Sequence, residues 1–252
     1  MNKVDKQRVQ QTFQRAAVSY ESQAMIQHRV ADHLLALLDC HGGKEIHRVL
    51  EIGCCTGLLT RKLVEQCNEI YELVLNDLVE GFAVQAGNRI GIPAISFLAG
   101  DIETMPLSGP FDLIISSSTF HWIHDLDGLL KKLADNMAPG ATLAFSMYGP
   151  DNLEEIRELT GIGLDYVGLQ EVQAMVEKHF TLDHSDQQRE VFHFATPIEI
   201  LNHLRQTGVN AVSRKPWTHR RLQRFKEEYT EKFSDDQGVR LTYHPLYLLA
   251  HR

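Results

Sequence analysis

Between about residues 48 and 147, short apolar runs alternate with segments in which apolar residues recur every three or four positions. The runs are typical of buried parallel strands, and the segments between them are typical of amphipathic helices. Such alternation predicts an α/β fold with a doubly wound, mostly parallel sheet. The predicted strands are Arg48–Ile52, Tyr71–Asn76, Ile95–Ala99, Phe111–Ser116 and Ala141–Met147, and the predicted helices are Gly57–Cys67, one ending near Arg89–Gly91, and Asp127–Met137, closed by Pro139-Gly140.

Helical spacing also covers residues 5–39 and ends at His41-Gly42-Gly43. Beyond residue 150 two late strands bring the sheet to seven, and a helical cap is inserted before the last of them. We therefore expect a single domain over 1–252, with N-terminal helices in 1–43 and a cap in 195–238. The late helices are predicted at Leu169–Phe180, Pro197–Gln206 and Leu222–Phe233, and the late strands at Asp183–Phe194 and Leu241–Ala250.

Composition narrows the class of protein. The 252 residues are 43% apolar and carry a net charge of −8, which fits one sizeable α/β core and argues against broad nucleic-acid binding. No apolar run approaches the ~18 residues that span a bilayer, and Met1–Arg8 is polar. The four cysteines show no C-x-x-C pair and no disulfide framework, and no ligand spacing indicates a metal site. We expect a cytoplasmic monomer without a metal, a membrane or a nucleic-acid partner.

The loop after the first strand carries the strongest chemical signal. Glu51 ends an apolar run, and the small-residue turn Gly53–Gly57 leads directly into a helical pattern. Open α/β sheets bind nucleotides at such junctions. The turn lacks a complete G-x-G-x-x-G, and a carboxylate there repels a pyrophosphate. A cationic ligand with ribose hydroxyls, such as S-adenosylmethionine, suits the junction better, and E-x-G-x-x-x-G resembles the first motif of class I methyltransferases.

Acidic residues follow three successive strands: Glu51, Asp77 and Asp101. In a parallel sheet we expect all three to face one crevice. A carboxylate is an acceptor-only group that suits ribose hydroxyls, which we assign to Asp77, whereas Asp101 suits an adenine amino group. Each of these acidic residues, taken singly, could also be a helix N-cap. Their occurrence at the ends of three successive strands favours a binding site.

The loop after the fourth strand is expected at the reaction centre. Ser116 and Ser117 are candidates for the methionine part of the cofactor, and His121 and Trp122 for walls of the acceptor pocket. Tyr20, in the N-terminal helical region, is a candidate for a lid that excludes water. Structural roles in the core remain alternatives for all three ring-bearing residues.

A basic run in the predicted cap stands out in an acidic chain. Between residues 196 and 226 seven cations accompany a single acid, Glu199. A solvated face is one interpretation and a nucleic-acid patch another, but the position in the cap favours docking of an acidic partner. The cations assigned to docking are Arg205, Arg214, Lys215, Arg220, Arg221 and Arg224, and Lys226 completes the run.

Several motifs together resemble one family, the malonyl-[acyl-carrier protein] O-methyltransferases of biotin synthesis. Phe13–Ala24 resembles their F-x-x-A-A-x-x-Y-[DE]-x-x-A segment, Gly100–Pro106 their G-D-I-E-x-x-P, and Phe111–Trp122 their F-D-L-x-x-S…Q-W. The resemblance covers about residues 10–250, with further similarity at Thr207–Ala211 and Leu241–His244. Three single residues depart from the family: Cys55 stands where the family usually has glycine, Ser117 where asparagine is common, and His121 where glutamine is common. The segment Asn76–Val79 also lacks the usual D-x-S-P ending.

The resemblance implies a Rossmann-like methyltransferase sheet, S-adenosylmethionine as cofactor, and acyl-carrier protein bearing malonyl-phosphopantetheine as partner. It implies a cofactor loop of Glu51, Gly53, Cys54 and Gly57, ribose on Asp77, adenine against Leu78, Asp101 and Ile102, and closure by Tyr20. The acceptor is then a carboxylate, with a pKa of about 4, which needs no general base. Two alternatives remain: a methyltransferase for another carboxylic acid or a quinone precursor, and a non-catalytic S-adenosylmethionine-binding protein.

Overall fold

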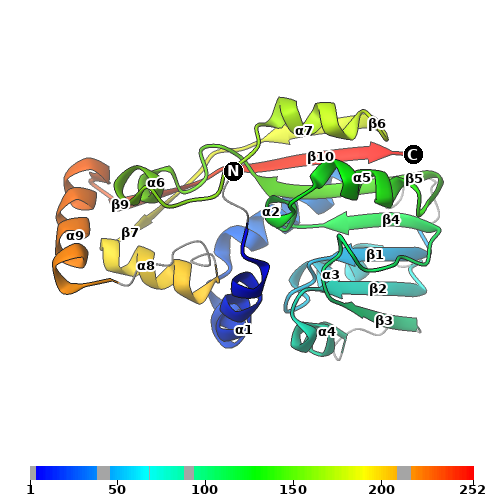
Figure 1. Ribbon diagram of the computed structural model, residues 1–252, viewed down its shortest axis with the longest axis horizontal. Helices are drawn as coiled ribbons and strands as arrows, with labels where there is room; N and C mark the ends of the chain where they lie inside the picture. The colour runs from blue at the N-terminus through cyan, green and yellow to red at the C-terminus, as the bar shows by residue number, and fades with distance from the viewer. Residues whose placement is uncertain (1–3, 39–45, 68, 88–93, 209–216) are drawn as a thin grey trace.

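A seven-stranded sheet forms the centre of the molecule (Figure 1). The computed structural model describes residues 4–38, 46–67, 69–87, 94–208 and 217–252. The strand order is β3-β2-β1-β4-β5-β10-β6, and β10 runs antiparallel to the other six strands. The predicted doubly wound, mostly parallel sheet is thus confirmed. Its strands are β1 (Arg48–Ile52), β2 (Glu72–Asp77), β3 (Ala94–Ala99), β4 (Phe111–Ser116), β5 (Met137–Tyr148), β6 (Thr181–Gln187) and β10 (Pro245–His251).

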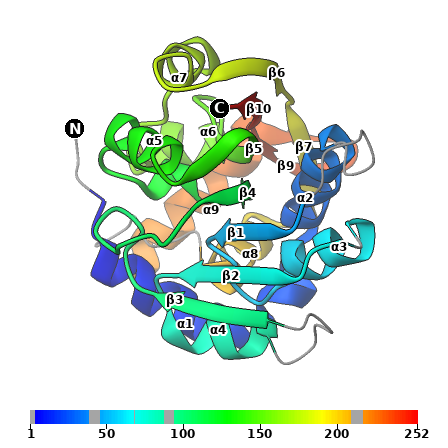
Figure 2. The ribbon, with the colours of Figure 1, turned by 90° about the vertical axis from the view of Figure 1, so that its right-hand side faces the viewer.

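Helices cover both faces of the sheet (Figure 2). On β4, Leu113 and Ile115 pack with α2 and α3, whereas Ile114 packs with α5 and α7 on the opposite face. One strand supplies both hydrophobic cores because successive side chains point to opposite faces. The helices are α2 (Met25–Leu37), α3 (Leu58–Gln66), α4 (Glu80–Gly87), α5 (Leu126–Ala134) and α7 (Leu169–Val176).

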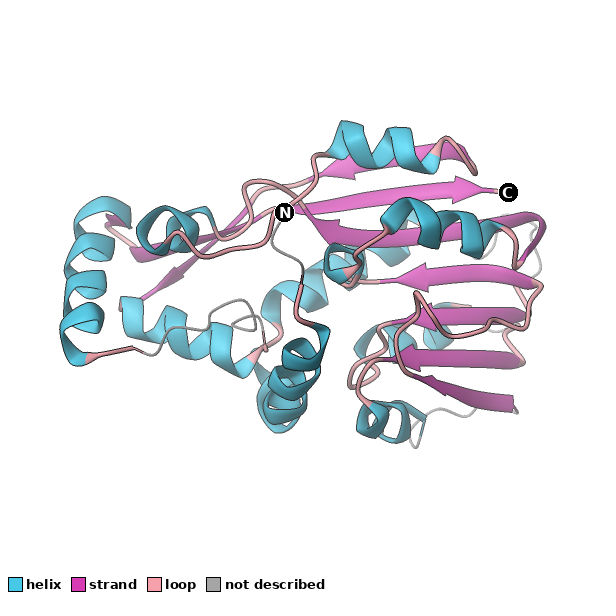
Figure 3. Ribbon diagram, viewed as in Figure 1, coloured by secondary structure: helices cyan, strands magenta, loops and turns pink. Residues whose placement is uncertain are grey.

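The strand register places the chemistry-bearing loops at one edge. Ile52 pairs with Asn76 on β2 and with Ser116 on β4, and Asp77 pairs with Ala99 on β3. The carboxyl ends of these strands therefore coincide, and their loops face α1 across the middle of the molecule (Figure 3).

The N-terminal region in which helical spacing covers residues 5–39 consists of two helices, α1 (Lys6–Gln23) and α2. The chain leaves helical geometry at Ala24, which has φ −79° and ψ 40° and is almost fully buried. This break lets α2 pack on the sheet while α1 turns toward the loops.

The two late predicted strands each prove to be two strands in different sheets (Figure 1). β6 is followed by β7, and β9 is followed by β10, because the chain bends near Gln188 and Pro245. Gln188 N donates to Pro245 O at 3.0 Å where both bends lie. The second sheet, in the order β7-β9-β8, packs with α8 and α9. These elements are β7 (Glu190–Phe194), α8 (Pro197–Gln206), α9 (His219–Phe233), β8 (Ser234–Asp235) and β9 (Gly238–Tyr243).

Two further differences from prediction lie around β5. α5 ends at Ala134, and β5 runs through Pro139-Gly140, where its pairing with β4 shifts from Met137 to Thr142. Proline is tolerated at such an irregularity because no ladder N–H is required there. The seven-residue α6 (Glu154–Thr160) escaped prediction because it is too short for a periodic signal.

Cys67, after α3, takes part in a disulfide, whereas Cys54 and Cys55 are free thiols. The expectation that no cysteine is paired is therefore wrong, because pairing depends on which segments meet in space. No helix in the described part of the chain is long and apolar enough to cross a membrane.

Candidate active site

The β1–α3 loop is a tight turn that depends on glycine at both ends. Gly53 has φ +75°, and a Cβ there would lie 2.1 Å from Thr119 Oγ1. Gly57 has φ +85°, and a Cβ would lie 2.9 Å from the backbone of Ala86. Both positions need left-handed backbone and close approach, which glycine allows. Cys55, between them, also adopts a left-handed conformation at φ +47°.

Asp77 ties this loop to the end of β2. Its Oδ2 accepts from Cys55 N at 2.9 Å, and its Oδ1 accepts from Val79 N at 2.8 Å. Burial raises the pKa of Asp77 to about 6, against the lowering effect of these backbone N–H groups. The carboxylate lines a cleft at the carboxyl end of the sheet, as a ribose-binding acceptor must.

Glu51 does not line that cleft. It is buried beneath the loop, where desolvation raises its pKa to about 8 although the neighbouring Thr60 hydroxyl lowers it. Its Oε2 has no hydrogen-bond partner among the described residues. The expected trio of acids facing one crevice is thus a pair, Asp77 and Asp101, because Glu51 points from β1 toward α3 instead.

Asp101 faces the cleft but is already ion-paired. Lys6 Nζ lies 2.7 Å from Asp101 Oδ1 and also contacts Glu103. Further along α1, Gln10 Nε2 donates to Leu78 O at 2.9 Å. α1 therefore spans the cleft and bonds to the loops after both β2 and β3. Leu78 and Ile102 form apolar walls beneath it.

The loop after β4 completes the cleft with Ser117, Ser118, Thr119 and Trp122. Ser116, by contrast, is fully buried in the sheet, where its Oγ donates to Ile52 O at 2.9 Å. Its register opposite Ile52 turns the hydroxyl onto the neighbouring strand rather than into the cleft.

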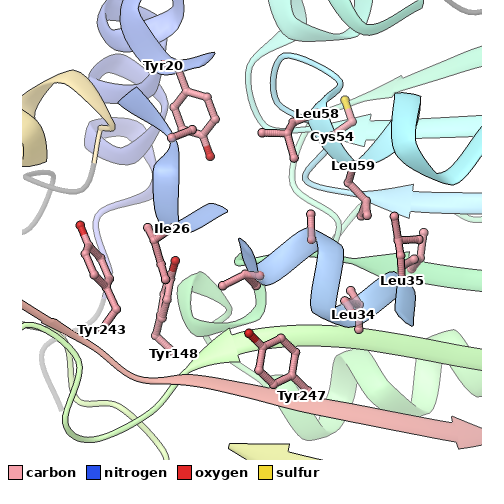
Figure 4. Packing of buried hydrophobic residues seen from close by; sticks show 14 of the residues in the cluster. Tyr20, Ile26, Leu34, Leu35, Cys54, Leu58, Leu59, Tyr148, Tyr243 and Tyr247 are labelled. Atoms are coloured by element: carbon pink, nitrogen blue, oxygen red, sulfur yellow. The ribbon is translucent and has the colours of Figure 1, made fainter. Parts of the chain in front are cut away.

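Tyr20 lines the cleft from α1, and Figure 4 shows its side chain leaving that helix. Its hydroxyl lies near the Cys55 thiol, and burial raises the pKa of both groups. Cys54 is buried among apolar residues and does not line the cleft. The thiol that reaches the cleft is therefore that of Cys55.

His121 and Trp122 have separate environments. His121 packs against Trp122 and Tyr148, with ring centroids 5.0 and 5.1 Å apart. Burial lowers the pKa of His121 to about 3, so the ring is neutral at pH 7. His121 is absent from the described linings of both clefts, whereas Trp122 lines the cleft at the carboxyl end of the sheet and a second cleft beside it.

Comparison with known proteins shows the family to which this chain belongs. The family described as "Methyltransferase domain" matches residues 50–145. The malonyl-[acyl-carrier protein] O-methyltransferase of Calditerrivibrio nitroreducens is 36% identical over 95% of this chain and 94% of its own length. The enzyme of that name from Chlorobium phaeovibrioides is 38% identical over 98% and 97%. The chain belongs to this family of malonyl-[acyl-carrier protein] O-methyltransferases.

Solved structures support the fold. The YcgJ protein of Bacillus subtilis superposes with a TM-score of 0.66 at 14% identity, covering 89% of this chain and 98% of its own. The N-methyltransferase NodS of Bradyrhizobium japonicum, in complex with S-adenosyl-L-homocysteine, has a TM-score of 0.52 at 16% identity, covering 93% and 98%.

As an O-methyltransferase of this family, the protein uses S-adenosylmethionine. The cleft fits that cofactor, because Gly53 brings loop backbone without a side chain to its lining and Asp77 presents a carboxylate to it. Leu78 and Ile102 supply apolar surface of the kind that an adenine ring requires.

The second cleft lies between α6, α8 and the start of α9, and sequence reasoning did not find it. Its lining is mostly apolar, and its only charged residues among those described are Arg157 and Arg205. Arg157 falls outside the basic run, on a helix too short to predict, so only the three-dimensional arrangement reveals it. The described lining residues are Trp122, Leu153, Ile156, Arg157, Thr160, Ile162, Gly163, Leu164, Tyr166, Ile198, Leu201, Asn202, Leu204, Arg205, Trp217 and Leu222.

The other predicted docking residues lie on α9. Arg220 and Arg224 are exposed, and Arg224 pairs with Glu228 at 2.7 Å. The Arg221 guanidinium stacks 4.6 Å from the centre of Trp217. Arg214 and Lys215 lie outside the described residues.

Proposed function

We propose that this protein transfers a methyl group from S-adenosylmethionine to the free carboxylate of a malonyl thioester carried on acyl-carrier protein, giving the methyl ester that primes pimeloyl synthesis for biotin. The supporting observation is the extent of the chain over which it is similar to its relatives. The curated relatives align over 95–99% of the chain in the examples from Calditerrivibrio nitroreducens and Haemophilus influenzae. The shared region therefore includes α1, α8 and α9, which lie outside the catalytic core at 50–145.

The reaction requires the protein mainly to align the methyl group with the acceptor carboxylate and to exclude water. Bound S-adenosylmethionine supplies an electrophilic methyl group on a sulfonium. The acceptor carboxylate is ionised at neutral pH, so the neutral, buried His121 need not act as a base. Tyr20 and Trp122 wall the cleft and keep water out. Opposite charges cancel in the transition state, which a dry site favours.

We assign lid and docking roles to the two segments outside the core. α1 closes over the cofactor through the Lys6–Asp101 and Gln10–Leu78 contacts. The cap at 195–238 receives the acidic carrier with Arg205, Arg220, Arg221 and Arg224, and the same role is proposed for Arg214 and Lys215. The expected monomeric state, cytoplasmic location and lack of a nucleic-acid partner stay predictions.

The test is mass-spectrometric detection of methyl gain on malonyl-carrier and on a free malonyl thioester. We expect carrier-borne malonate to be methylated at much lower concentration. Arg220→Glu, Arg221→Glu and Arg224→Glu together should raise KM for the carrier and spare the free thioester. Lys178→Glu, which reverses an exposed charge beyond α7, is the matched control. Equal use of both acceptors by the wild type would favour a small-molecule methyltransferase instead.

A further inference from the structure

Arg157 is a cation without a counter-ion in an apolar cleft. Its Nη2 donates to Pro150 O, and its guanidinium carbon lies 5.6 Å from the centre of the Tyr166 ring. Its Nε is buried without a hydrogen-bond partner among the described residues. No described carboxylate lies within 4.0 Å of it. Two guanidinium nitrogens, Nε and Nη1, are thus without a described partner.

Two other partly buried arginines are neutralised by carboxylates. Arg48 pairs with Glu72 at 2.9 Å, and Arg61 pairs with Glu21. A charge taken out of water without a partner is costly, and proteins keep such charges where a ligand completes the pair. A guanidinium N–H donates a charge-assisted hydrogen bond to a carboxylate oxygen, and its positive charge balances the negative charge of the carboxylate. The second cleft is therefore built for an anion.

The position of Trp122 connects this cleft to the cofactor. Its indole lines both clefts, so the two clefts adjoin at this residue. At its other end the second cleft shares Thr160 and Trp217 with a shallow surface hollow that also contains Arg221 and Arg224. The hollow, the second cleft and the cofactor cleft thus follow one another from the docking residues inward.

We propose that Arg157 binds the carboxylate of the acceptor, an inference that rests on the proposed function. One oxygen is held by the guanidinium, and the other forms a bond to the methyl carbon as the sulfur–carbon bond breaks. The electron pair of that bond stays on the sulfur, which becomes a neutral thioether, and no proton moves. The product ester has lost the negative charge, so it loses the ion pair with Arg157 and leaves. An acyl chain without a carboxylate, such as acetyl, is disfavoured for the same reason.

Gly163 fixes where this arginine stands. A Cβ at residue 163 would lie 2.4 Å from Arg157 Cδ and 2.5 Å from its Cγ. Gly163→Ala therefore displaces the guanidinium without removing its charge. This gives a second, independent variant that probes position alone.

The experiment compares the binding of malonyl-carrier and acetyl-carrier to wild type, Arg157→Gln and Gly163→Ala. We expect the wild type to prefer malonyl-carrier by about 10- to 100-fold, the range of a charged hydrogen-bonded contact. Arg157→Gln should bind both carriers alike, and Gly163→Ala should narrow the preference. S-adenosylmethionine affinity should stay within twofold of wild type, which also shows that each variant is folded.

Arg205→Gln separates recognition from docking. Arg205 is the other charged residue of this cleft, but it is exposed and bonds to Asn202 Oδ1 at 3.1 Å. We expect its loss to weaken both carriers equally. The inference is overturned if Arg157→Gln keeps the wild-type preference, or if Arg205→Gln alone abolishes it. Failure of the wild type to methylate malonyl-carrier would instead refute the proposed function, because the binding preference is measured without turnover.

Discussion

Replacing Asp77 by asparagine tests the cofactor assignment most directly. Each carboxylate oxygen accepts one backbone N–H, from Cys55 at 2.9 Å and from Val79 at 2.8 Å. The amide keeps one acceptor and turns an NH₂ toward the other N–H, which costs about 1–3 kcal/mol. Against this, the asparagine is neutral. Burial raises the pKa of Asp77 from 3.8 to about 6, so at pH 7, above both values, ionised Asp77 destabilises the fold by roughly 3 kcal/mol.

These two effects oppose each other, so we expect Asp77→Asn to fold with a free energy of unfolding within about 2 kcal/mol of wild type. Cofactor binding has no such compensation. Loss of a charged acceptor for the ribose hydroxyls removes about 1.5–3 kcal/mol, which weakens S-adenosylmethionine binding by about 10- to 100-fold. Titration calorimetry measures this affinity, and chemical denaturation without ligand measures the stability.

Asp112→Asn is the matched control. Asp112 Oδ2 also accepts two backbone N–H groups, from His47 at 3.1 Å and Arg48 at 2.8 Å, but at the opposite end of the sheet. We expect this variant to lose stability while keeping wild-type cofactor affinity. If Asp77→Asn binds S-adenosylmethionine as tightly as the wild type, the ribose assignment is refuted.

Three further outcomes are expected. Affinity for S-adenosylmethionine should fall as the pH drops through about 6, because Asp77 becomes protonated and loses both its charge and a hydrogen-bond acceptor. Calorimetric titrations at several pH values measure this affinity, and an affinity that does not change with pH would contradict the expectation. Cys55→Gly should bind S-adenosylmethionine at least as tightly as the wild type, since it relieves a left-handed residue and widens the cleft; weaker binding would mean that the thiol contributes a contact. Acidification from pH 6.5 to 4 should lower the free energy of unfolding less in His203→Gln than in wild type. Burial lowers the pKa of His203 to about 4, so between pH 6.5 and 4 a proton binds to this histidine mainly in the unfolded chain. Chemical denaturation at several pH values measures the free energy of unfolding, and an equal pH dependence in the two proteins would exclude this role.

Sequence patterns located the strands accurately where apolar runs were uninterrupted. β1 and β4 begin and end at the predicted residues, since buried parallel strands are apolar on both faces. An apolar run does not show, however, which way the polar side chains at its end point. Nothing in the chain distinguishes a polar residue that enters the cleft from one that turns inward, and this is why Ser116 and Glu51 were assigned to the cofactor although one bonds to β1 and the other is buried beneath the loop.

Two site residues that prediction missed could not be found from local spacing. Arg157 stands on a seven-residue helix, and Lys6 reaches Asp101 across 95 positions of sequence. Likewise, the bends at Gln188 and Pro245 that divide the late strands are set by which sheet each half joins. Such features depend on long-range packing, which local spacing does not encode.

The placement of β10 has a consequence for biosynthesis. This strand follows every other in the chain, yet it lies between β5 and β6 and pairs with both. A ribosome-bound chain can assemble β1 to β5 early, but until residues 245–251 emerge, the facing edges of β5 and β6 have no partner and are open to unwanted association. The interval before residues 245–251 emerge should therefore be the stage at which the nascent protein most needs a chaperone.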